Sequence, residues 1–313
     1  MKILMIVSAG YIKGGIESYV TLIRPILEEQ GHIVKILSSD ECSDVPHFSD
    51  YEYKVPSGAF RYLSYTFNVH AYCTLKRIIR EFAPDVVHIE TIGHASPSIL
   101  FALDRANTFM TIHGPEAFVE SMIVLCQPLS DFRDHTQDKQ HLRLIGKVRY
   151  FYYRYIIGFL YRRALRRVKV MVTPSLYMQR LVAESGYENI CILNGTTLFS
   201  SDTDRDAWRD QTIVFAGRLE KFKGVDVLLR AFPAILERFP KAHLMLAGDG
   251  DEREYFENLS ARLGIASAVE FMGRIDRKGI EELFRRSSIV VMPSVWVEAF
   301  GLVGIEAMSV GRP

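Results

Sequence analysis

The sequence predicts an α/β protein made of two Rossmann-like domains, each with a parallel sheet. Short runs of β-branched and other apolar residues alternate with longer segments whose apolar residues recur at helical spacing. Such alternation is typical of parallel sheets that carry helices on both faces. One polar, charged stretch interrupts the alternation, which then begins again. We therefore expect two similar domains that face each other across a cleft.

The first domain is expected to contain five buried strands, because five runs have the length and composition of strands. They are Lys2–Ser8, Ile33–Leu37, Val86–Ile89, Thr108–Ile112 and Val168–Thr173. Helical stretches lie between most of them. The first predicted helix places Val20, Ile23, Ile26 and Leu27 on one face. We assign residues 1–193 to this domain.

A linker is predicted over residues 194–210, where apolar periodicity is lost in a run rich in Ser, Asp and Arg. A second set of strands follows it. These strands are Thr212–Ala216, His243–Ala247, Val269–Met272 and Ile289–Met292. Residues 211–313 therefore form the second domain.

Composition restricts the class of protein. The chain has 313 residues, 48% of them apolar, which is enough for two cores. The 38 basic and 37 acidic residues nearly cancel, so global charge gives no reason to expect a nucleic-acid partner. The four cysteines are far apart, which predicts a reducing compartment and no metal site. No apolar run is long enough for a membrane span, and we expect a cytoplasmic protein.

Two features of the first domain lie where strands end, which is where ligands of open α/β sheets bind. Gly14 and Gly15 follow the first strand and precede a helix, so backbone N–H groups can face an anion there. Their spacing is not G-x-G-x-x-G, and a flexible turn is the alternative. His113 follows the strand at 108–112. A hydrogen-bonded structural role is the alternative to a catalytic one.

Basic residues and glycines follow the strands of the second domain. Arg218 and Lys223 lie in a glycine-bounded loop after the strand at 212–216, and together they can bind a diphosphate. A solvated loop is the alternative. Gly248 follows the next strand and leaves room for a base or a phosphate, although turn chemistry also explains a glycine.

The segment 293–306 leads from the last predicted strand into a helix and carries two carboxylates. Glu298 lies beside the expected helix N-terminus, Gly301 permits close approach of the backbone, and Glu306 lies about two turns into the helix. A helix N-terminus favours phosphate, and carboxylates accept hydrogen bonds from sugar hydroxyls. An ordinary turn with two solvated glutamates is the alternative.

Taken together, these residues resemble the family-4 retaining glycosyltransferases of the GT-B fold, over nearly the whole chain. The motifs that carry the resemblance are Gly14-Gly15-x-Glu17, Gly31-His32-x-Val34, Asp85-Val86-Val87-His88, His113, Pro174-Ser175, Asn194-Gly195, Gly217-Arg218-Leu219, Lys223-Gly224, Gly248-x-Gly250, Phe271-x-Gly273, Pro293-Ser294, Glu298-x-Phe300-Gly301-Leu302 and Glu306-Ala307-Met308. Each motif is weak evidence alone. Coincidence is a poor explanation for so many of them in the family's order on both sides of one linker.

The resemblance implies a nucleotide-diphosphate sugar as donor, transfer with retained anomeric configuration, and neither a metal nor another cofactor. The implied catalytic residues are His113, Arg218, Lys223 and Glu298. The implied donor-binding residues are Gly14, Gly15, Arg218, Lys223, Gly248, Phe300, Gly301, Leu302 and Glu306. Within these sets it assigns His113 to a hydroxyl of the donor sugar, Glu298 to the sugar and Glu306 to the ribose.

The same resemblance implies a glycan or lipid-linked acceptor in cell-surface polysaccharide or glycolipid synthesis. Two departures from the family pattern qualify it. Asn194-Gly195 leads into two threonines instead of a hydrophobic residue and Asp, and the chain stops at Pro313, where family members continue. We therefore expect a truncated second domain, with an inactive remnant or a sugar-nucleotide-binding module as the alternative function. Nucleotide-sugar epimerisation is a third possibility.

Residues 143–169 combine nine basic residues with seven aromatic ones and contain no acid. This pattern suits an anionic membrane surface, which predicts a peripheral protein at the inner face of the cell membrane. A helix that packs its aromatic side on the core is the alternative. A nucleic-acid partner is not expected, because no recognisable binding motif accompanies the charge.

Overall fold

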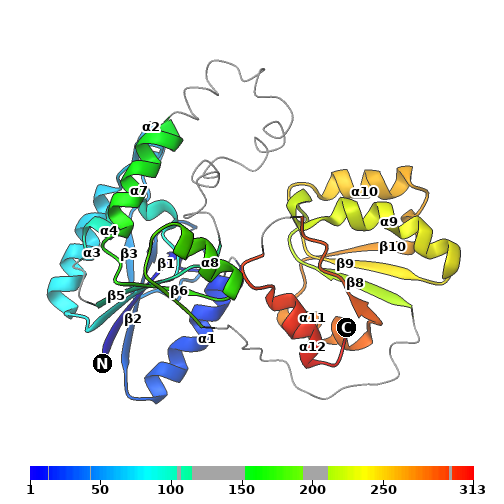
Figure 1. Ribbon diagram of the computed structural model, residues 1–313, viewed down its shortest axis with the longest axis horizontal. Coiled ribbons are helices and arrows are strands. Elements are labelled where there is room, and N and C mark those ends of the chain that lie inside the picture. The colour runs from blue at the N-terminus through cyan, green and yellow to red at the C-terminus, as the bar shows by residue number, and fades with distance from the viewer. Residues whose placement is uncertain (13, 43, 104–106, 115–151, 193–210, 296–297) are drawn as a thin grey trace. The chain divides into compact units, whose positions relative to one another are not determined.

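The computed structural model describes residues 1–12, 14–42, 44–103, 107–114, 152–192, 211–295 and 298–313. The chain divides into two compact units, Met1–Leu193 and Asn194–Pro313, each with its own sheet and helices (Figure 1). We describe each unit by itself. The predicted linker 194–210 and residues 143–151 of the basic aromatic segment lie outside the described residues.

The first unit is built on a seven-stranded parallel sheet in the order β3-β2-β1-β4-β5-β6-β7. Its strands are β1 Lys2–Ala9, β2 Ile33–Ser39, β3 Tyr51–Tyr53, β4 Val86–Ile89, β5 Thr108–Thr111, β6 Val170–Thr173 and β7 Asn189–Cys191. The five predicted strands are confirmed, with ends that differ by no more than two residues. Strands β3 and β7 extend the sheet at its two edges and were not predicted.

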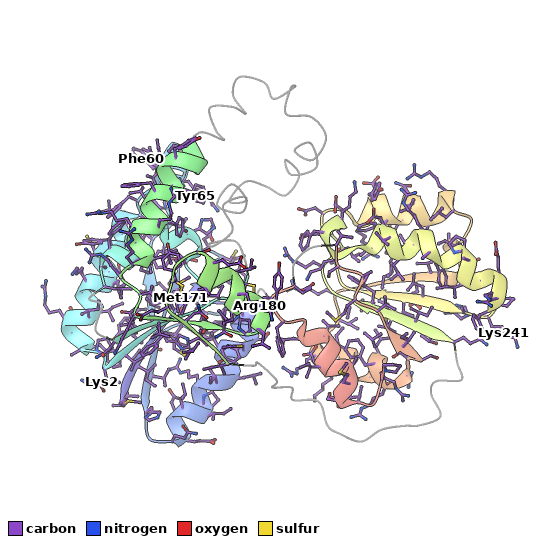
Figure 2. All side chains as sticks on the ribbon, viewed as in Figure 1. Lys2, Phe60, Tyr65, Met171, Arg180 and Lys241 are labelled. Carbon is purple, nitrogen blue, oxygen red and sulfur yellow. The ribbon has the colours of Figure 1, made fainter. Side chains whose placement is uncertain are left out.

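Helices cover the sheet of the first unit. They are α1 Gly15–Glu29, α2 Ala59–Ser64, α3 Val69–Phe82, α4 Ser98–Phe101, α7 Gly158–Leu165 and α8 Leu176–Glu184, with a 3-10 turn η1 at Gly93–Ala95 and a π-helical turn η6 at Tyr152–Ile157. Helix α1 packs Ile16, Val20, Ile23 and Leu27 against β1 and β2. Ile26 is exposed instead of buried, because it lies beside this stripe of residues. Met171 of β6 lies within the sheet layer, whereas Phe60 of α2 points away from it (Figure 2).

The second unit has a four-stranded parallel sheet in the order β10-β9-β8-β11. Its strands are β8 Thr212–Ala216, β9 His243–Ala247, β10 Val269–Gly273 and β11 Ile289–Val290. Its helices are α9 Val225–Arg238, α10 Arg253–Arg262, α11 Arg277–Arg286 and α12 Leu302–Ser309, with 3-10 turns η8 at Lys221–Lys223 and η9 at Ala266–Ala268. The prediction of a second strand-helix alternation is confirmed.

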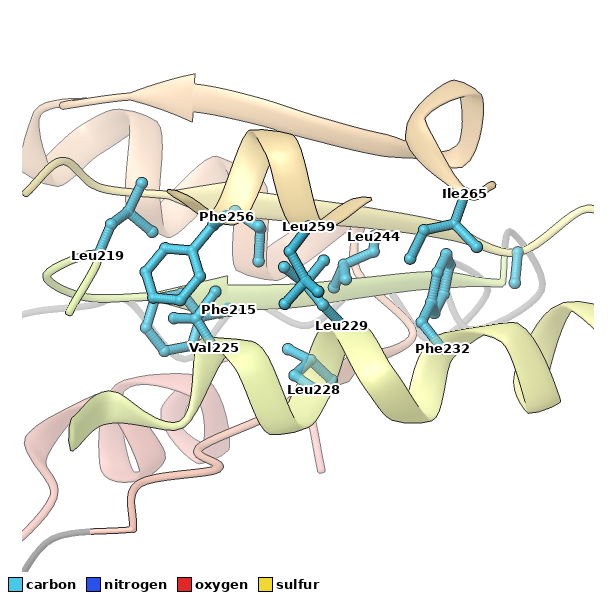
Figure 3. Packing of buried hydrophobic residues seen from close by; sticks show 12 residues of the cluster. Phe215, Leu219, Val225, Leu228, Leu229, Phe232, Leu244, Phe256, Leu259 and Ile265 are labelled. Carbon is cyan, nitrogen blue, oxygen red and sulfur yellow. The ribbon is translucent and has the colours of Figure 1, made fainter. Parts of the chain in front are cut away.

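Two hydrophobic cores lie on opposite faces of this sheet. On one face, Leu229 and Phe232 of α9 and Phe256 of α10 pack against Phe215 and Leu244 (Figure 3). On the other face, Phe284 of α11 and Ala307 and Val310 around α12 pack against Val214 and Ala247. Helices on both faces of a parallel sheet leave its carboxyl edge as the place where loops gather.

The last strand differs from the sequence prediction. A buried strand was expected over Ile289–Met292, but β11 contains only Ile289 and Val290, and Ile289 is 40% exposed. Among the described residues β11 pairs with β8 alone, so one edge of the strand is not covered by a neighbouring strand. In α12 the buried positions are Ala307 and, just beyond the helix, Val310, whereas Met308 is 71% exposed.

Candidate functional site

The predicted donor-binding residues of the second unit gather at the carboxyl edge of its sheet. Arg218 and Lys223 follow β8, and Glu298 lies in the segment that joins β11 to α12. We call Arg218, Lys223, Glu298, Glu306 and the backbone of Phe300–Leu302 the candidate donor site. Open α/β sheets bind ligands at this edge, so the position agrees with the sequence expectation.

Lys223 and Glu298 form the central contact of the candidate donor site. Lys223 Nζ lies 2.5 Å from Glu298 Oε1, and the hydroxyl of Ser294 donates to the same oxygen at 2.6 Å. Burial alone would raise the pKa of Glu298, but the bonds from Lys223 and Ser294 lower it below its usual value. Glu298 is therefore a charged carboxylate that neutralises Lys223 in the free protein.

Tight backbone packing brings these two residues together although they are far apart in the sequence. Gly224 has φ +71°, and a Cβ atom there would lie 1.9 Å from the carbonyl oxygen of Pro293. The N–H of Val295 donates to the carbonyl of Phe222 at 3.0 Å. The turn after β8 and the segment after β11 thus lie in direct contact, which aligns Lys223 with Glu298.

Arg218 is the most accessible cation of the candidate donor site, with 65% of its side chain exposed. Its Nη1 donates to Glu220 at 2.9 Å, and its guanidinium lies 5.2 Å from the centre of the Phe222 ring. Burial raises the pKa of Glu220, while the charge of Arg218 opposes this rise. Arg218 therefore has a defined position and still faces solvent, as a phosphate-binding arginine needs.

Gly248 and Gly301 differ in what their backbone requires. Gly248 donates its N–H to Gly273 at 2.8 Å, and a Cβ atom at Gly248 would lie 1.8 Å from the carbonyl oxygen of Gly217. Packing between strand ends thus explains Gly248 without a ligand. Gly301 has φ +83° and is the residue before α12, where it leaves the helix N-terminus without a side-chain cap. The first backbone N–H groups of α12 therefore have no side-chain acceptor from the cap residue and can bind an anion.

Glu306 is the fifth residue of α12, so it lies just over one turn into the helix rather than two. Burial raises the pKa of its carboxyl group, and the charge of Arg277 opposes this rise. A half-buried carboxylate that gains hydroxyl partners on ligand binding would lose this penalty. Its environment therefore fits the predicted contact with a ribose.

The predicted residues of the first unit also share one sheet edge. Gly14 and Gly15 begin α1, whose N-terminus has no side-chain cap. Gly14 is extended and a Cβ at Gly15 would meet no atom within 4 Å, so neither position requires glycine for its own backbone. The ring of Tyr19 on α1 lies 6.1 Å from that of His113, which follows β5. Tyr19, in the second turn of α1, and His113 are thus neighbours.

Sequence reasoning missed Glu90, whose carboxylate holds His113. Glu90 Oε2 lies 2.7 Å from His113 Nε2, and the Glu90 side chain has no exposed surface. His88 lies beside the second oxygen, at 3.4 Å. The position of Glu90 in the sequence could have identified it. Glu90 directly follows the strand Val86–Ile89, and His113 likewise lies just after the end of β5.

The described part of the basic aromatic segment exposes both kinds of side chain. Tyr155 and Phe159 are more than half exposed, and Arg162 and Arg163 of α7 face solvent. The buried hydrophobic residues in the described part of the segment are Ile157, Ala164, Leu165 and Val168. Exposed arginines and exposed aromatic side chains therefore occur together in η6 and α7.

Two features are absent from the described residues. Within those ranges, no group of three or more His, Cys, Asp or Glu side chains is arranged to hold a metal ion. None of the described helices is long and apolar enough to cross a membrane.

Two parallel sheets with helices on both faces, and polar residues at their carboxyl edges, match the GT-B fold of solved glycosyltransferase structures. The structure of Anabaena HepE in complex with UDP and glucose superposes with a TM-score of 0.64 and 18% identity, over 100% of this chain and 79% of that one. WaaG, described as a glycosyltransferase of lipopolysaccharide biosynthesis, gives a TM-score of 0.64 and 15% identity over 99% and 80% of the two chains.

The chain belongs to glycosyltransferase family 4. The model described as Glycosyltransferase Family 4 matches residues 13–196, and that described as Glycosyl transferases group 1 matches residues 204–313. A phosphatidyl-myo-inositol mannosyltransferase of Mycobacterium tuberculosis is 26% identical over 99% of this chain and 76% of its own length. An uncharacterised glycosyltransferase of Methanocaldococcus jannaschii is 43% identical over 33% of this chain and 26% of its own length.

Proposed function

We propose that this protein transfers a sugar, with retention of configuration, from a nucleotide-diphosphate donor to a glycan or lipid-linked acceptor in cell-surface polysaccharide or glycolipid synthesis. The main support is the pair Lys223 and Glu298 beside the exposed Arg218, at one sheet edge. The names of its relatives agree in class. A relative matched over 99% of this chain is a phosphatidyl-myo-inositol mannosyltransferase, and HepE has been solved with UDP and glucose.

The chemistry follows from where charge develops. Departure of a nucleoside diphosphate builds negative charge on the leaving oxygen, and fixed cations stabilise this transition state more than the ground state. Arg218 and Lys223 supply these charges, so the proposal needs neither a metal nor another cofactor. We infer that the acceptor attacks the donor sugar from the same face from which the phosphate departs, and that the departing phosphate assists this attack.

Glu298 has a second role in this proposal. In the free protein its carboxylate accepts from Lys223 and Ser294. A diphosphate would take over part of the Lys223 charge and leave Glu298 able to accept from a sugar hydroxyl, together with the backbone of Phe300–Leu302. Glu306 would bind the ribose, and His113 a hydroxyl of the donor sugar. The ion pair of Lys223 and Glu298 is therefore one that a bound donor would separate.

Calorimetric titration of the full chain with UDP, GDP and their sugar derivatives tests the diphosphate site. Lys223→Ala is expected to weaken binding roughly 10- to 100-fold, since a charged hydrogen bond contributes about 1.5–3 kcal/mol. Lys221→Ala is the matched control, because Lys221 lies on the same turn but contacts Glu252 and the ring of Tyr255. Equal affinity of wild type and Lys223→Ala would refute the assignment.

Turnover separates transfer from the alternatives. A membrane extract supplies glycan and lipid acceptors, and NMR of the product reports the anomeric configuration. A retained configuration supports the proposal. A new sugar isomer formed from donor alone would indicate epimerisation instead, and binding without turnover would indicate a sugar-nucleotide-binding module.

We also propose that the exposed face of η6 and α7 contacts an anionic membrane surface, at the inner face of the cell membrane. Arginines beside exposed aromatic side chains favour such a surface, each charge contributing about 1 kcal/mol. Co-sedimentation with phosphatidylglycerol vesicles is expected to fall when Arg162, Arg163 and Arg166 are replaced by Ala. Equal sedimentation of wild type with neutral phosphatidylcholine vesicles would contradict the proposal.

A further inference from the structure

Glu90 is a buried carboxylate that the proposed reaction does not yet use. It follows β4 directly, and its backbone N–H donates to the carbonyl of Ile6 at 2.8 Å. Its side chain has no exposed surface. An ionised carboxylate in such a place is costly unless it is paired. Glu90 therefore depends on the partners that surround it.

Two histidines supply this pairing. Glu90 Oε2 lies 2.7 Å from His113 Nε2, and Glu90 Oε1 lies 3.4 Å from His88 Nδ1. The opposite nitrogen of His88 lies 2.7 Å from the hydroxyl of Thr111 on β5. Burial alone would raise the pKa of Glu90, but the hydrogen bond from His113 and the charge of His88 lower it. Glu90 therefore acts as a charged hydrogen-bond acceptor.

The protonation of the His113 ring follows from this contact. A carboxylate can only accept, so His113 Nε2 must carry the hydrogen that lies between them. In a neutral imidazole the other nitrogen is then an acceptor, and here it is Nδ1. The ring of Tyr19 also lies beside His113 and packs edge-on against it. Burial, helped by the charge of Glu90, raises the pKa of Tyr19 to about 12, so Tyr19 stays neutral.

We propose that Glu90 is a positioning residue that fixes His113 in its Nε2–H form, so that Nδ1 accepts a hydrogen bond from a substrate hydroxyl. This inference rests on the proposed function for the identity of the substrate. It adds a requirement of specificity: the substrate group at His113 must donate a hydrogen bond. A hydroxyl meets this requirement, whereas a phosphate oxygen or a carbonyl does not.

The ring form of His113 can be measured in the free, full-length protein. Two-bond nitrogen-15 NMR at pH 8 distinguishes the two neutral forms, and His113→Gln assigns the signal among the nine histidines. Wild type is expected to show the Nε2–H form alone. Glu90→Gln is expected to show a mixture, because an amide can donate or accept. A wild-type ring in the Nδ1–H form, or a ring signal unchanged in Glu90→Gln, overturns the inference.

Glu52→Gln is the matched control. Glu52 Oε1 lies 2.6 Å from Nδ1 of His47, a histidine-carboxylate pair in the same unit that does not touch His113. This variant is expected to change the His47 signal and leave that of His113 in place. If Glu90→Gln does not fold, the wild-type spectrum still decides the matter, because the inference requires the Nε2–H form there.

Binding then separates positioning from a general loss of structure. Glu90→Gln is expected to bind UDP as wild type does, because UDP lacks the donor sugar whose hydroxyl His113 is proposed to contact. It is expected to bind the best nucleotide sugar of the calorimetric series about 10-fold more weakly, which corresponds to the loss of one well-made hydrogen bond. Equal weakening for both ligands contradicts the positioning role. If wild type binds no nucleotide sugar, the proposed function fails while the NMR result still tests the ring form.

Discussion

Gly224 shows how a single residue can hold the candidate donor site together. Its φ is +71°, and a Cβ atom would lie 1.9 Å from the carbonyl oxygen of Pro293, so there is no room for a side chain. Gly224→Ala is expected to destabilise the second unit by more than about 4 kcal/mol, because the clash involves backbone on both sides. Thermal unfolding monitored by circular dichroism measures this loss.

Gly264→Ala provides the control for backbone strain. Gly264 has the same φ of +71°, but a Cβ there would meet no atom within 4 Å. Its cost should be about 1–2 kcal/mol, which is the strain of the left-handed conformation alone. The difference between the two variants isolates the contact with Pro293. Equal costs would mean that the two segments do not meet as described.

The ionised carboxylate of Glu306 is expected to lower the free energy of unfolding at neutral pH, because it is partly buried. Its folded-state pKa is raised by burial, so its contribution to stability is present below the unfolded pKa and is lost as the pH rises through the folded value. Glu306→Gln should therefore melt at a higher temperature than wild type at pH 7. The gain should disappear near pH 4, where the wild-type carboxyl is protonated. Calorimetric melting across this pH range measures it.

A variant of Glu298 is expected to change the melting temperature in the opposite direction. The folded-state pKa of Glu298 is lowered, so its contribution to stability is present at neutral pH and is lost as the pH falls through the folded value. Glu298→Gln should melt at a lower temperature than wild type at pH 7. If both variants shift melting in the same direction at pH 7, the charges do not act as described.

At this scale the sequence indicated which polar residues lie at the carboxyl edges of the sheets but not which partners they contact. Arg218 and Lys223 were recognisable because basic residues followed a strand between glycines. The pairing of Lys223 with Glu298 spans 75 positions and depends on the contact of Gly224 with Pro293, which no local pattern encodes. Glu90 was missed because one acidic residue after a strand looks like any solvated turn.

Asn68 is the N-cap residue of α3 and connects this helix to two neighbouring segments of the chain. Its side-chain oxygen accepts from the N–H of Ala71 at 3.1 Å, while its amide donates to the carbonyls of Lys54 and His94. Asn68→Ala is expected to cost roughly 2–4 kcal/mol, about 1 for the cap and the rest for two carbonyls left without a donor. Chemical denaturation of the full chain measures this cost.

Ser175→Ala is the control within the same unit. Ser175 caps α8 by accepting from the N–H of Met178 at 3.2 Å, and its loss should cost only about 1 kcal/mol. Asn68→Asp refines the comparison, because it keeps the cap and removes the two donors. An Asn68→Ala cost no larger than that of Ser175→Ala would show that the loop contacts contribute nothing.

Elements were predictable where burial produces a continuous apolar run. Strands β8 and β9 have the predicted limits because their residues, apart from His243 at the start of β9, form β-branched or apolar runs. Strands β3 and β7 have three residues each and include Glu52 and Asn189, so they lack such a run. Their position at the two edges of the sheet depends on pairing with β2 and β6, which is tertiary information.

At the scale of the whole molecule, each unit has its own sheet and its own core, so each is expected to unfold as a cooperative transition of its own. Differential scanning calorimetry of the full chain should show two transitions. Gly224→Ala should lower one of them and Asn68→Ala the other. A single transition shifted by both variants would show that the units unfold together.

Ligand binding should then distinguish the two transitions. The residues proposed for the nucleoside diphosphate, Arg218, Lys223 and Glu306, all belong to the second unit. A ligand that binds only folded protein stabilises it by about 2.7 kcal/mol at a concentration 100 times Kd. UDP, or the nucleotide that binds best, should therefore raise only the transition that Gly224→Ala lowers, and Lys223→Ala should reduce the rise to about 0.4–1.4 kcal/mol at the same ligand concentration. If UDP raised the transition that Asn68→Ala lowers, the diphosphate site would lie in the first unit, at Gly14 and Gly15.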